Sequence, residues 1–350
     1  MPVDPIPIPG VAGQCVLVTG AGGFIGSEMV RVLAASGAEK IILLETAEQH
    51  LFVISSEMTA RGYGDRCVPI LGSVCDRALL AALFGEHRPE IILHAAALKH
   101  VPLMEHNPFA AIGTNSLGTW WLAKVAAEYR TRRLILVSTD KAVAPHSIMG
   151  ASKRIAELIA LANPQFAIAV RLVNVIGSPG SVSPLFADQI ACGGPITVTH
   201  PGARRFFLTL HEVIHLLAQA IDVSQSGILV PNGGDSIRIE DLARRMIAAS
   251  GCDIRIVFTG TRPGDKLEES LVSEGERDSG FVTTGLRLVT SPPSLNLDDR
   301  IRALESAIAA RDLPLLLSLV QGLVPDYEPS LVLRNAAPER AAVPALTASR

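Results

Sequence analysis

The sequence lacks the marks of several protein classes. None of its 350 residues lies in an apolar run approaching the roughly 18 residues that a transmembrane helix needs. Its five cysteines show no C-x-x-C spacing, and an odd number of scattered cysteines is typical of reduced thiols, which predicts a cytoplasmic location. A formal net charge of −3 disfavours a general nucleic-acid-binding protein. We therefore expect neither a membrane span nor a nucleic-acid partner.

The sequence does have ample apolar material. Hydrophobic residues make up 48% and charged residues 19%, which suffices for a large core. Short β-branched runs alternate with helical patterns through the first two thirds of the chain. This order predicts an α/β fold with a Rossmann-like, doubly wound parallel sheet covered by helices on both faces. The expected strands are 15–20, 40–45, 66–72, 90–96, 133–139 and 166–177, and the helices that separate them are 24–37, 47–62, 76–87, 108–130 and 149–163.

Changes in composition divide the chain into segments. The first residues have no basic start and no apolar helix, so they are predicted to form an extended, Pro-rich arm and not a signal peptide. After Gly177, Gly and Pro become frequent, which is typical of a smaller lobe built from loops. The predicted segments are the arm 1–13, an NAD(P)-binding domain 14–177, a substrate-binding lobe 178–275 with some return to that domain, a C-terminal helical segment 276–335 and a tail 336–350.

A glycine-rich turn, "VTGAGGFIG", follows the first strand and opens a helix. In that context the backbone N–H groups of a turn and a helix N-terminus can meet a pyrophosphate, although a tight turn without a ligand would look the same. A carboxylate that ends the second strand, Glu45, would accept hydrogen bonds from a ribose and repel a 2′-phosphate. With no arginine after it, the pattern favours NAD over NADP; the alternative is a surface carboxylate. The candidates in the turn are Gly20, Gly23, Phe24, Ile25 and Gly26.

The segment "STDKAVAPHSIMGASKR" runs from the end of the fifth predicted strand into the next helix. Ligands of an open parallel sheet lie beyond such strand ends, so Asp140 and Lys141 could serve there as an acid and a base, or form a salt-bridged loop. Lys153 has the spacing of a Tyr-x-x-x-Lys pair, but Met149 stands at the tyrosine position. A thioether cannot transfer a proton, so Met149 is either a packing residue or the mark of a subgroup.

Several stretches resemble the nucleotide-sugar 4,6-dehydratases of polysaccharide biosynthesis, within the extended short-chain dehydrogenase/reductase superfamily. The resemblance is to members such as the UDP-N-acetylglucosamine 4,6-dehydratases, some of which carry methionine at the tyrosine position. It covers roughly residues 12 to 272, and "STDKA" and "HAAALKHVP" are its most specific motifs. The matching stretches are "VTGAGGFIGSE", "HAAALKHVPLMEHNP", "NSLGT", "STDKAVAP", "MGASKR", "RLVNVIGSPGSVSPLF" and "RPGDKLEE".

The resemblance implies a mechanism in which NAD oxidises carbon 4 of a UDP-sugar, water is lost and carbon 6 is then reduced. Lys141 would remove the carbon-5 proton, which requires a pKa lowered by burial. Asp140 would protonate the departing 6-hydroxyl, Thr139 would orient the 4-hydroxyl, and Lys153 would hold the nicotinamide ribose. A homo-oligomer is expected.

Further site residues are predicted around this centre. Arg262 resembles the family's diphosphate-binding arginine, and Asn174 its pyrophosphate- or sugar-contacting asparagine. Arg205 is a weaker candidate, and Lys99 and His100 would line the sugar pocket. Additional candidates for cofactor binding are Ser73, Val74, Ala95, Ala96 and Ala97.

Two alternatives remain from the sequence. A nucleotide-sugar epimerase or reductase on the same fold would need no loss of water. The motif "HEVIH", His211 to His215, matches a zinc-hydrolase pattern, but no third ligand follows at a diagnostic spacing, so no metal is expected. A Rossmann module without catalytic activity is the remaining possibility of another class.

Overall fold

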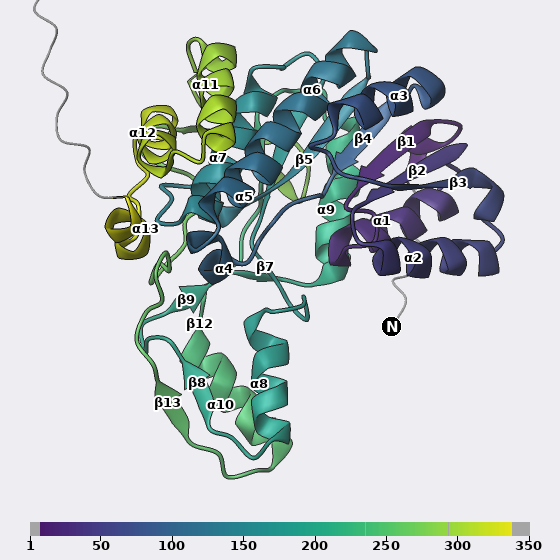
Figure 1. Ribbon diagram of the computed structural model, residues 1–350. Helices are drawn as coiled ribbons and strands as arrows, with labels where there is room; N and C mark the ends of the chain where they lie inside the picture. The colour runs from purple at the N-terminus through teal and green to yellow at the C-terminus, as the bar shows by residue number, and fades with distance from the viewer. Residues whose placement is uncertain (1–7, 235, 293, 338–350) are drawn as a thin grey trace, which may run out of the picture.

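A nine-stranded sheet forms the centre of the computed structural model, which describes residues 8–234, 236–292 and 294–337 (Figure 1). Its order is β14-β15-β11-β6-β5-β4-β1-β2-β3, and all neighbours from β3 to β11 are parallel. The strands β15 and β14 add an antiparallel edge. The predicted α/β fold with a mostly parallel sheet is confirmed. The strands are β1 Cys15–Thr19, β2 Lys40–Glu45, β3 Cys67–Leu71, β4 Ile91–His94, β5 Arg133–Thr139, β6 Ala167–Leu172, β11 Ile228–Pro231, β14 Arg277–Phe281 and β15 Leu286–Thr290.

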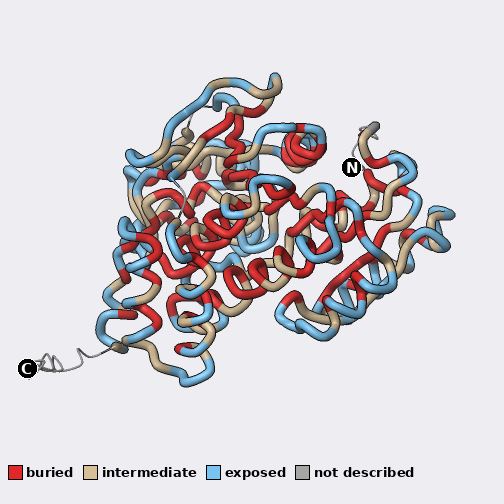
Figure 2. Tube along the Cα trace, turned by 90° about the horizontal axis from the view of Figure 1, so that it is seen from above, coloured by how far each residue is buried: buried red, intermediate tan, exposed pale blue. Residues whose placement is uncertain are grey.

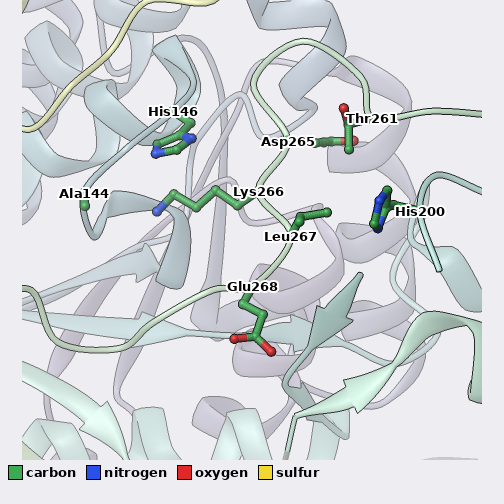
Figure 3. A pocket seen from close by; sticks show the side chains of 8 residues that line it. All are labelled: Ala144, His146, His200, Thr261, Asp265, Lys266, Leu267 and Glu268. Atoms are coloured by element: carbon green, nitrogen blue, oxygen red, sulfur yellow. The ribbon is translucent and has the colours of Figure 1, made fainter. Parts of the chain in front are cut away.

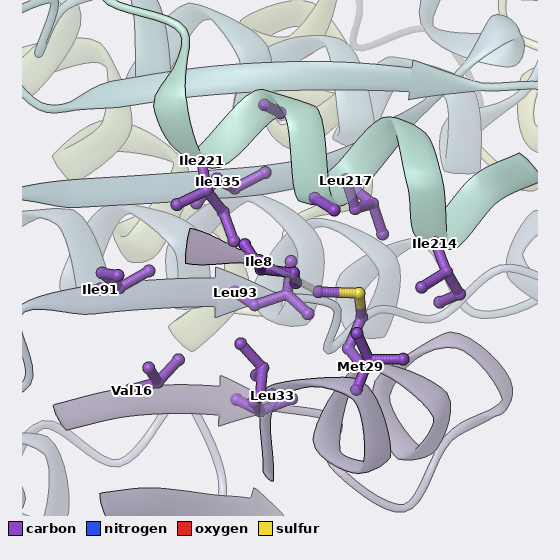
Figure 4. Packing of buried hydrophobic residues seen from close by; sticks show 14 of the residues in the cluster. Ile8, Val16, Met29, Leu33, Ile91, Leu93, Ile135, Ile214, Leu217 and Ile221 are labelled. Atoms are coloured by element: carbon purple, nitrogen blue, oxygen red, sulfur yellow. The ribbon is translucent and has the colours of Figure 1, made fainter. Parts of the chain in front are cut away.

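Both faces of the sheet are buried, which explains its near-continuous apolar strands. Side chains alternate along each strand, so Val16 and Leu17 enter different core clusters on opposite faces. On one face Met29 and Leu33 pack with Ile214 and other residues of α9 (Figure 4). The helices of that face are α1 Phe24–Ala35, α2 Glu48–Ala60 and α9 Leu210–Asp222, and the opposite face carries α3 Arg77–His87, α6 Gly118–Glu128 and α7 Ile148–Leu161.

The helix predicted over 108–130 is interrupted. It consists of α5 Pro108–Ile112, a π-helical turn Gly113–Leu117 and α6. Three C-terminal helices cover the outer side of α5, α6 and α7 in one further apolar cluster. A hydrogen bond of 2.9 Å from Trp120 Nε1 to Asp298 Oδ1 joins the two layers. The covering helices are α11 Leu297–Ala309, α12 Leu313–Leu323 and α13 Leu331–Ala336.

A smaller lobe lies at one end of the molecule and has its own core around Phe186, Val198 and Ala243 (Figure 1). Within the predicted segment 178–275, for which some return to the main domain was expected, α9 and β11 lie in the main body. The segment 276–335, predicted as helical, begins instead with β14 and β15, which extend the sheet. The elements of the lobe are α8 Val182–Ala191, β8 Ile196–Val198, β9 Arg204–Arg205, β12 Ile237–Arg238, α10 Ile239–Ser250 and β13 Ile256–Phe258. The remaining elements are α4 Val101–Glu105, β7 Asn174–Val175 and β10 Phe207–Leu208.

The N-terminal arm differs from the prediction in the part that the structure describes. Residues 1–7 and 338–350 lie outside the described residues. Pro9–Val11 forms a 3₁₀ turn, and Ile8 and Val11 are buried in the main core, so this part of the arm is not extended. Figure 2 shows buried segments of the chain, drawn in red, through the interior of the molecule. None of the helices in the described residues combines the length and the apolarity needed to cross a membrane.

Candidate active site

The glycine-rich turn packs the start of α1 closely against β1 and β4. Gly20 has φ +66°, a left-handed conformation that favours glycine. A Cβ on Gly26 would lie 2.0 Å from the Gly20 carbonyl oxygen. Among the described residues, the amides of Phe24, Ile25 and Gly26 have no hydrogen-bond acceptor. Free N–H groups at the start of a twelve-residue helix fit a pyrophosphate, so the residues present suit a dinucleotide.

Glu45 fixes the shape of this turn. Its buried carboxylate accepts hydrogen bonds from the backbone N–H groups of Gly22 at 3.0 Å, Thr46 at 2.9 Å and Ala47 at 3.1 Å. The sequence pattern predicts only contact with a ribose. The structure adds a second task, because the same carboxylate connects the end of β2 to the glycine-rich turn.

Of the cofactor-binding candidates that follow β3 and β4, some border the glycine-rich turn and others contact other parts of the chain. The backbone of Ala95 and Ala96 lies against Gly20, where a Cβ would be 2.9 Å from the Ala96 nitrogen, so the segment 95–97 borders the glycine-rich turn. Val74 is buried and packs against Gly118 of α6. The Ser73 hydroxyl accepts the amide of Cys75 at 3.1 Å.

His94, at the end of β4, is a polar residue that the sequence analysis missed. Its Nδ1 lies 2.7 Å from Thr19 Oγ1 and its Nε2 lies 2.8 Å from Thr119 Oγ1. The Thr119 hydroxyl donates to the Asn115 carbonyl, which assigns the ring proton to Nε2. Burial, together with the charge of Lys153, lowers the pKa of His94 to about 3. This neutral imidazole connects β1, β4 and α6 beneath the site.

Asp140 and Lys141 lie together at the end of β5. Lys141 Nζ donates to Asp140 Oδ1 at 3.0 Å and to Asn174 Oδ1 at 3.4 Å. The Thr139 hydroxyl donates to the same Asp140 oxygen at 2.9 Å. Asp140 is fully buried, and its Oδ2 has no hydrogen-bond partner among the described residues. The structure therefore brings four predicted site residues into one cluster.

The charge of Lys141 differs from the expectation. Burial alone lowers the pKa of Lys141, as the sequence analysis anticipated. The charges of Asp140 and Glu269 outweigh burial, so the pKa lies above its ordinary value. The expected depressed pKa is thus wrong for the free protein, in which Lys141 is an ammonium group. No local pattern in the sequence indicates that Glu269 comes within 3.8 Å of Lys141.

The helix α7 carries Met149 and Lys153 in its buried face. Its N-terminus is capped by Ser147, whose hydroxyl accepts the Gly150 amide at 3.1 Å. Met149 packs in the cluster beneath the C-terminal helices, as a packing residue would. Lys153 is 5% exposed and has neither a hydrogen bond nor an ion pair within the described part of the chain. Burial lowers its pKa to about 8, although Glu157 opposes this effect.

We expect Lys153→Met to stabilise the fold. A pKa lowered from 10.5 to about 8 corresponds to about 3 kcal/mol of unfavourable burial of the charged form. This cost acts below the folded pKa and disappears as the pH rises from about 8 to 10.5, because the neutral amine is then favoured in both states. Urea unfolding should give a large gain at neutral pH and little gain at alkaline pH. Lys124→Met, on the exposed ion pair with Asp298, is the control; equal behaviour of the two variants would contradict the prediction.

The π-helical turn places Asn115, a second residue missed from the sequence, between two parts of the site. Asn115 Oδ1 accepts the Leu98 amide at 2.8 Å, and its Nδ2 donates to the Leu98 carbonyl at 2.9 Å and to Ser152 Oγ at 2.9 Å. Such turns inside helices often occur at functional sites. Asn115 holds the loop after β4 against α7; "NSLGT" matched the family pattern, but no role followed from it.

The predicted substrate residues occupy separate positions. Lys99 Nζ donates to the Pro179 carbonyl at 3.0 Å, and His100 lies against Gly180. Arg205 donates to the carbonyls of Lys266 at 2.7 Å and Leu267 at 3.0 Å, so it holds that loop. Arg262 is exposed and pairs with Asp265 at 3.0 Å.

A cavity of 640 Å³ lies between the loop after β5 and the segment 261–268. Figure 3 shows Lys266 extending across it toward His146 and Ala144. Lys266 Nζ also donates to the Val143 carbonyl at 2.5 Å, which joins the cavity to the loop that follows Lys141. The lining residues are Ala144, His146, His200, Thr261, Asp265, Lys266, Leu267 and Glu268.

The "HEVIH" motif begins α9. The Glu212 carboxylate accepts the Thr209 amide at 2.7 Å, and the Thr209 hydroxyl accepts the Glu212 amide at 3.2 Å, which forms a capping box. His211 and His215 are exposed. No group of three or more potential metal ligands occurs among residues 8–234, 236–292 and 294–337.

Comparison with known proteins identifies the family of the chain. The chain is 43% identical over 277 residues to the capsular polysaccharide biosynthesis protein CapD of Staphylococcus aureus, which covers 76% of the chain and 46% of CapD. It thus spans about half the length of such relatives. The structure of Pen from Bacillus thuringiensis matches with a TM-score of 0.74 and 26% identity, over 81% of this chain and 89% of Pen.

A second solved structure is the dTDP-glucose 4,6-dehydratase DesIV of Streptomyces venezuelae, with NAD and TYD bound. It matches with a TM-score of 0.65 and 25% identity, over 74% of this chain and 88% of DesIV. Residues 16–286 match the family described as "Polysaccharide biosynthesis protein". The chain belongs to this family of polysaccharide biosynthesis proteins.

Proposed function

We propose that the protein is an NAD-dependent nucleotide-sugar 4,6-dehydratase that acts on UDP-N-acetylglucosamine and releases a UDP-4-keto-6-deoxy sugar. The observation that carries the proposal is the contact between the buried Asp140 and the part-buried Lys141 just after β5. The glycine-rich turn follows the carboxyl end of the parallel strand β1, so both lie at the same edge of the sheet. An acid and a base in direct contact suit the removal of water from adjacent carbons. The likeness to the dTDP-glucose 4,6-dehydratase DesIV supports this reaction class. The likeness to CapD supports a role in polysaccharide biosynthesis.

The residues divide the work as follows. When bound, NAD supplies reversible hydride transfer, and the N–H groups at the start of α1 hold its pyrophosphate. Lys141 removes the carbon-5 proton and Asp140 protonates the departing 6-hydroxyl. For these roles the proton between them must first move from Lys141 Nζ to Asp140 Oδ1 across their 3.0 Å hydrogen bond. Thr139, bonded to the same oxygen, orients the sugar, and Lys153 contacts the nicotinamide ribose.

The UDP part of the substrate binds beside the smaller lobe, at the segment that contains Arg262. Arg262 is exposed and available to a diphosphate, while Arg205 keeps the loop 266–267 in place. Asn174 contacts Lys141 and therefore lies within reach of the sugar. Lys99 and His100 border the sugar pocket.

Incubation of the purified chain with UDP-N-acetylglucosamine and NAD tests the proposal. Mass spectrometry should detect a product that has lost one water molecule. A product of unchanged mass would instead favour the epimerase alternative. If the protein does not convert UDP-N-acetylglucosamine but dehydrates another nucleotide sugar, the proposed reaction class stands and the proposed substrate is wrong.

We expect tighter binding of NAD than of NADP. The Glu45 carboxylate is fixed by three backbone amides at the end of β2, so it cannot move away from a 2′-phosphate, which it repels. Fluorescence titration with both dinucleotides measures the difference, and Glu45→Gln should reduce it. Glu48→Gln, on the exposed side of α2, is the matched control. NADP binding as tight as NAD binding would contradict the prediction.

A further inference from the structure

Glu269 joins the acid–base pair from a distant part of the chain. Its side chain is 3% exposed, and its Oε1 lies 3.8 Å from Lys141 Nζ and 3.8 Å from Arg205 Nε. Its Oε2 lies 3.8 Å from Lys266 Nζ and has no hydrogen-bond partner among the described residues. Asp140 Oδ2 is unpartnered in the same way. Two buried carboxyl groups, each with one unsatisfied oxygen, therefore flank one ammonium group.

The charges in this cluster determine whether a proton resides on Lys141, Asp140 or Glu269. Two carboxylates beside Lys141 stabilise its charged form and oppose the transfer of its proton to Asp140. Burial raises the pKa of Glu269 above its ordinary value, and the charge of Asp140 adds to this against the cations Lys141, Arg205 and Lys266. Glu269 is thus a group that can accept a proton more readily than an exposed glutamate.

We propose that Glu269 sets the charge of the Asp140–Lys141 pair, an inference that rests on the proposed function for its catalytic meaning. As a carboxylate, Glu269 holds the proton on Lys141. When Glu269 takes up one proton from solvent and becomes a carboxylic acid, it allows the N–H bond of Lys141 to break and an O–H bond to form on Asp140. The result is a neutral amine base beside a carboxylic acid, the two groups that dehydration requires. Glu269 acts through Lys141 and is a positioning residue.

The position of Glu269 also connects the pair to the cavity. It follows the segment 261–268 directly, and Lys266, which lines the cavity, is one of its three cationic neighbours. Charged groups face Glu269 from three places: Asp140 and Lys141 after β5, Arg205 on β9, and Lys266 on its own segment. A ligand that displaces Lys266 would therefore change the field at Glu269.

A titration that needs no substrate tests the inference. In protein labelled with ¹³C at the lysine ε carbons, the Lys141 signal is assigned by its loss in Lys141→Met. Glu269→Gln should lower the titration midpoint of Lys141 by about one to three pH units. Glu269→Asp, which keeps the charge, should lower it less. Glu274→Gln, on an exposed neighbour, should leave it unchanged. An unchanged Lys141 midpoint in folded Glu269→Gln would overturn the inference.

Further measurements separate this inference from the proposed function. The pH optimum of dehydration should move to lower pH in Glu269→Gln. If Glu269→Gln lowers the Lys141 midpoint but wild type dehydrates no nucleotide sugar, the proposed function fails and the inference stands. If wild type dehydrates a nucleotide sugar but Glu269→Gln leaves the Lys141 midpoint unchanged, the inference fails and the proposed function stands. If Glu269→Gln does not fold, the test is the titration of wild type labelled with ¹³C-glutamate. The midpoint of the Glu269 carboxyl group should lie above that of an ordinary glutamate. A normal or lower Glu269 midpoint would overturn the inference.

Discussion

Replacement of Lys141 by alanine should lower dehydration by about 10²–10⁴-fold, the usual contribution of a general acid–base group. Oxidation at carbon 4 does not need Lys141, so a 4-keto sugar that still contains its 6-hydroxyl should accumulate. Asp140→Asn should give a similar loss, because an amide is not a competent acid for the departing hydroxyl. Both residues lie in one hydrogen-bonded pair, so the double variant should lose little more than either single variant.

Solvent deuterium provides the direct measurement for Lys141. Wild type should incorporate deuterium at carbon 5 during turnover, and Lys141→Ala should not. A folded control is Lys124→Ala, on the outer side of α6. Wild-type deuterium incorporation and product formation in Lys141→Ala would remove Lys141 from the role of base.

Replacement of Arg171 by methionine should destabilise the fold by about 3–5 kcal/mol, as expected when one partner of a buried ion pair is removed. Arg171 is fully buried and donates to both carboxylate oxygens of Glu157 at 2.8 and 2.7 Å and to both of Glu276 at 2.7 Å. Glu157 also accepts the hydroxyl of Ser138, two residues before Asp140, at 2.7 Å. Loss of Arg171 leaves two buried carboxylates whose remaining ion-pair partner among the described residues is Arg154.

The pH dependence of unfolding distinguishes this cause from loss of packing. Burial alone would raise the pKa of Glu157, but the Arg171 guanidinium outweighs it and lowers the pKa to about 2. In wild type this stabilisation is present above the ordinary pKa and is lost as the pH falls toward about 2. In Arg171→Met the buried carboxyls should favour protonation, so the variant should gain stability from neutral to mildly acidic pH.

Urea unfolding measures both effects. Arg302→Met, on an exposed pair with Asp299, should change stability little. A loss below about 1 kcal/mol in Arg171→Met, within the range of surface pairs, would contradict the expected role.

Much of the fold could be predicted because the local signals agree with the final packing. Strands such as 40–45 are buried on both faces, so their apolar runs need no knowledge of their neighbours. The N-cap residue of α3, Asp76, accepts the Leu79 amide at 3.0 Å, and Gly37 follows the end of α1 with φ +83°. These features depend on a few adjacent residues.

The interruption at Gly113–Leu117 could not be predicted, because its hydrogen bonds come from elsewhere. Asn115 is held by Leu98 and Ser152, which a helical periodicity over 108–130 does not reveal. The same holds for Glu269. In sequence "KLEES" looks like an exposed charged stretch, and only the fold brings it beside Lys141 and Arg205. The charge of Asp140 and the approach of Glu269 together raise the pKa of Lys141 against burial, so the predicted direction of this pKa was wrong.

The C-terminal helices cover an apolar surface that is exposed on the nascent chain until these helices have been made. Trp120 and Asp298, which join α6 to α11, are 178 positions apart in the sequence. A nascent chain that ends before α11 would present the apolar outer side of α5, α6 and α7 to water. Such surface on a partly made chain is prone to aggregation and is a target for chaperones on the ribosome. Because the ribosome makes the covering helices last, the apolar cluster beneath them forms only after the sheet and the glycine-rich turn have been translated.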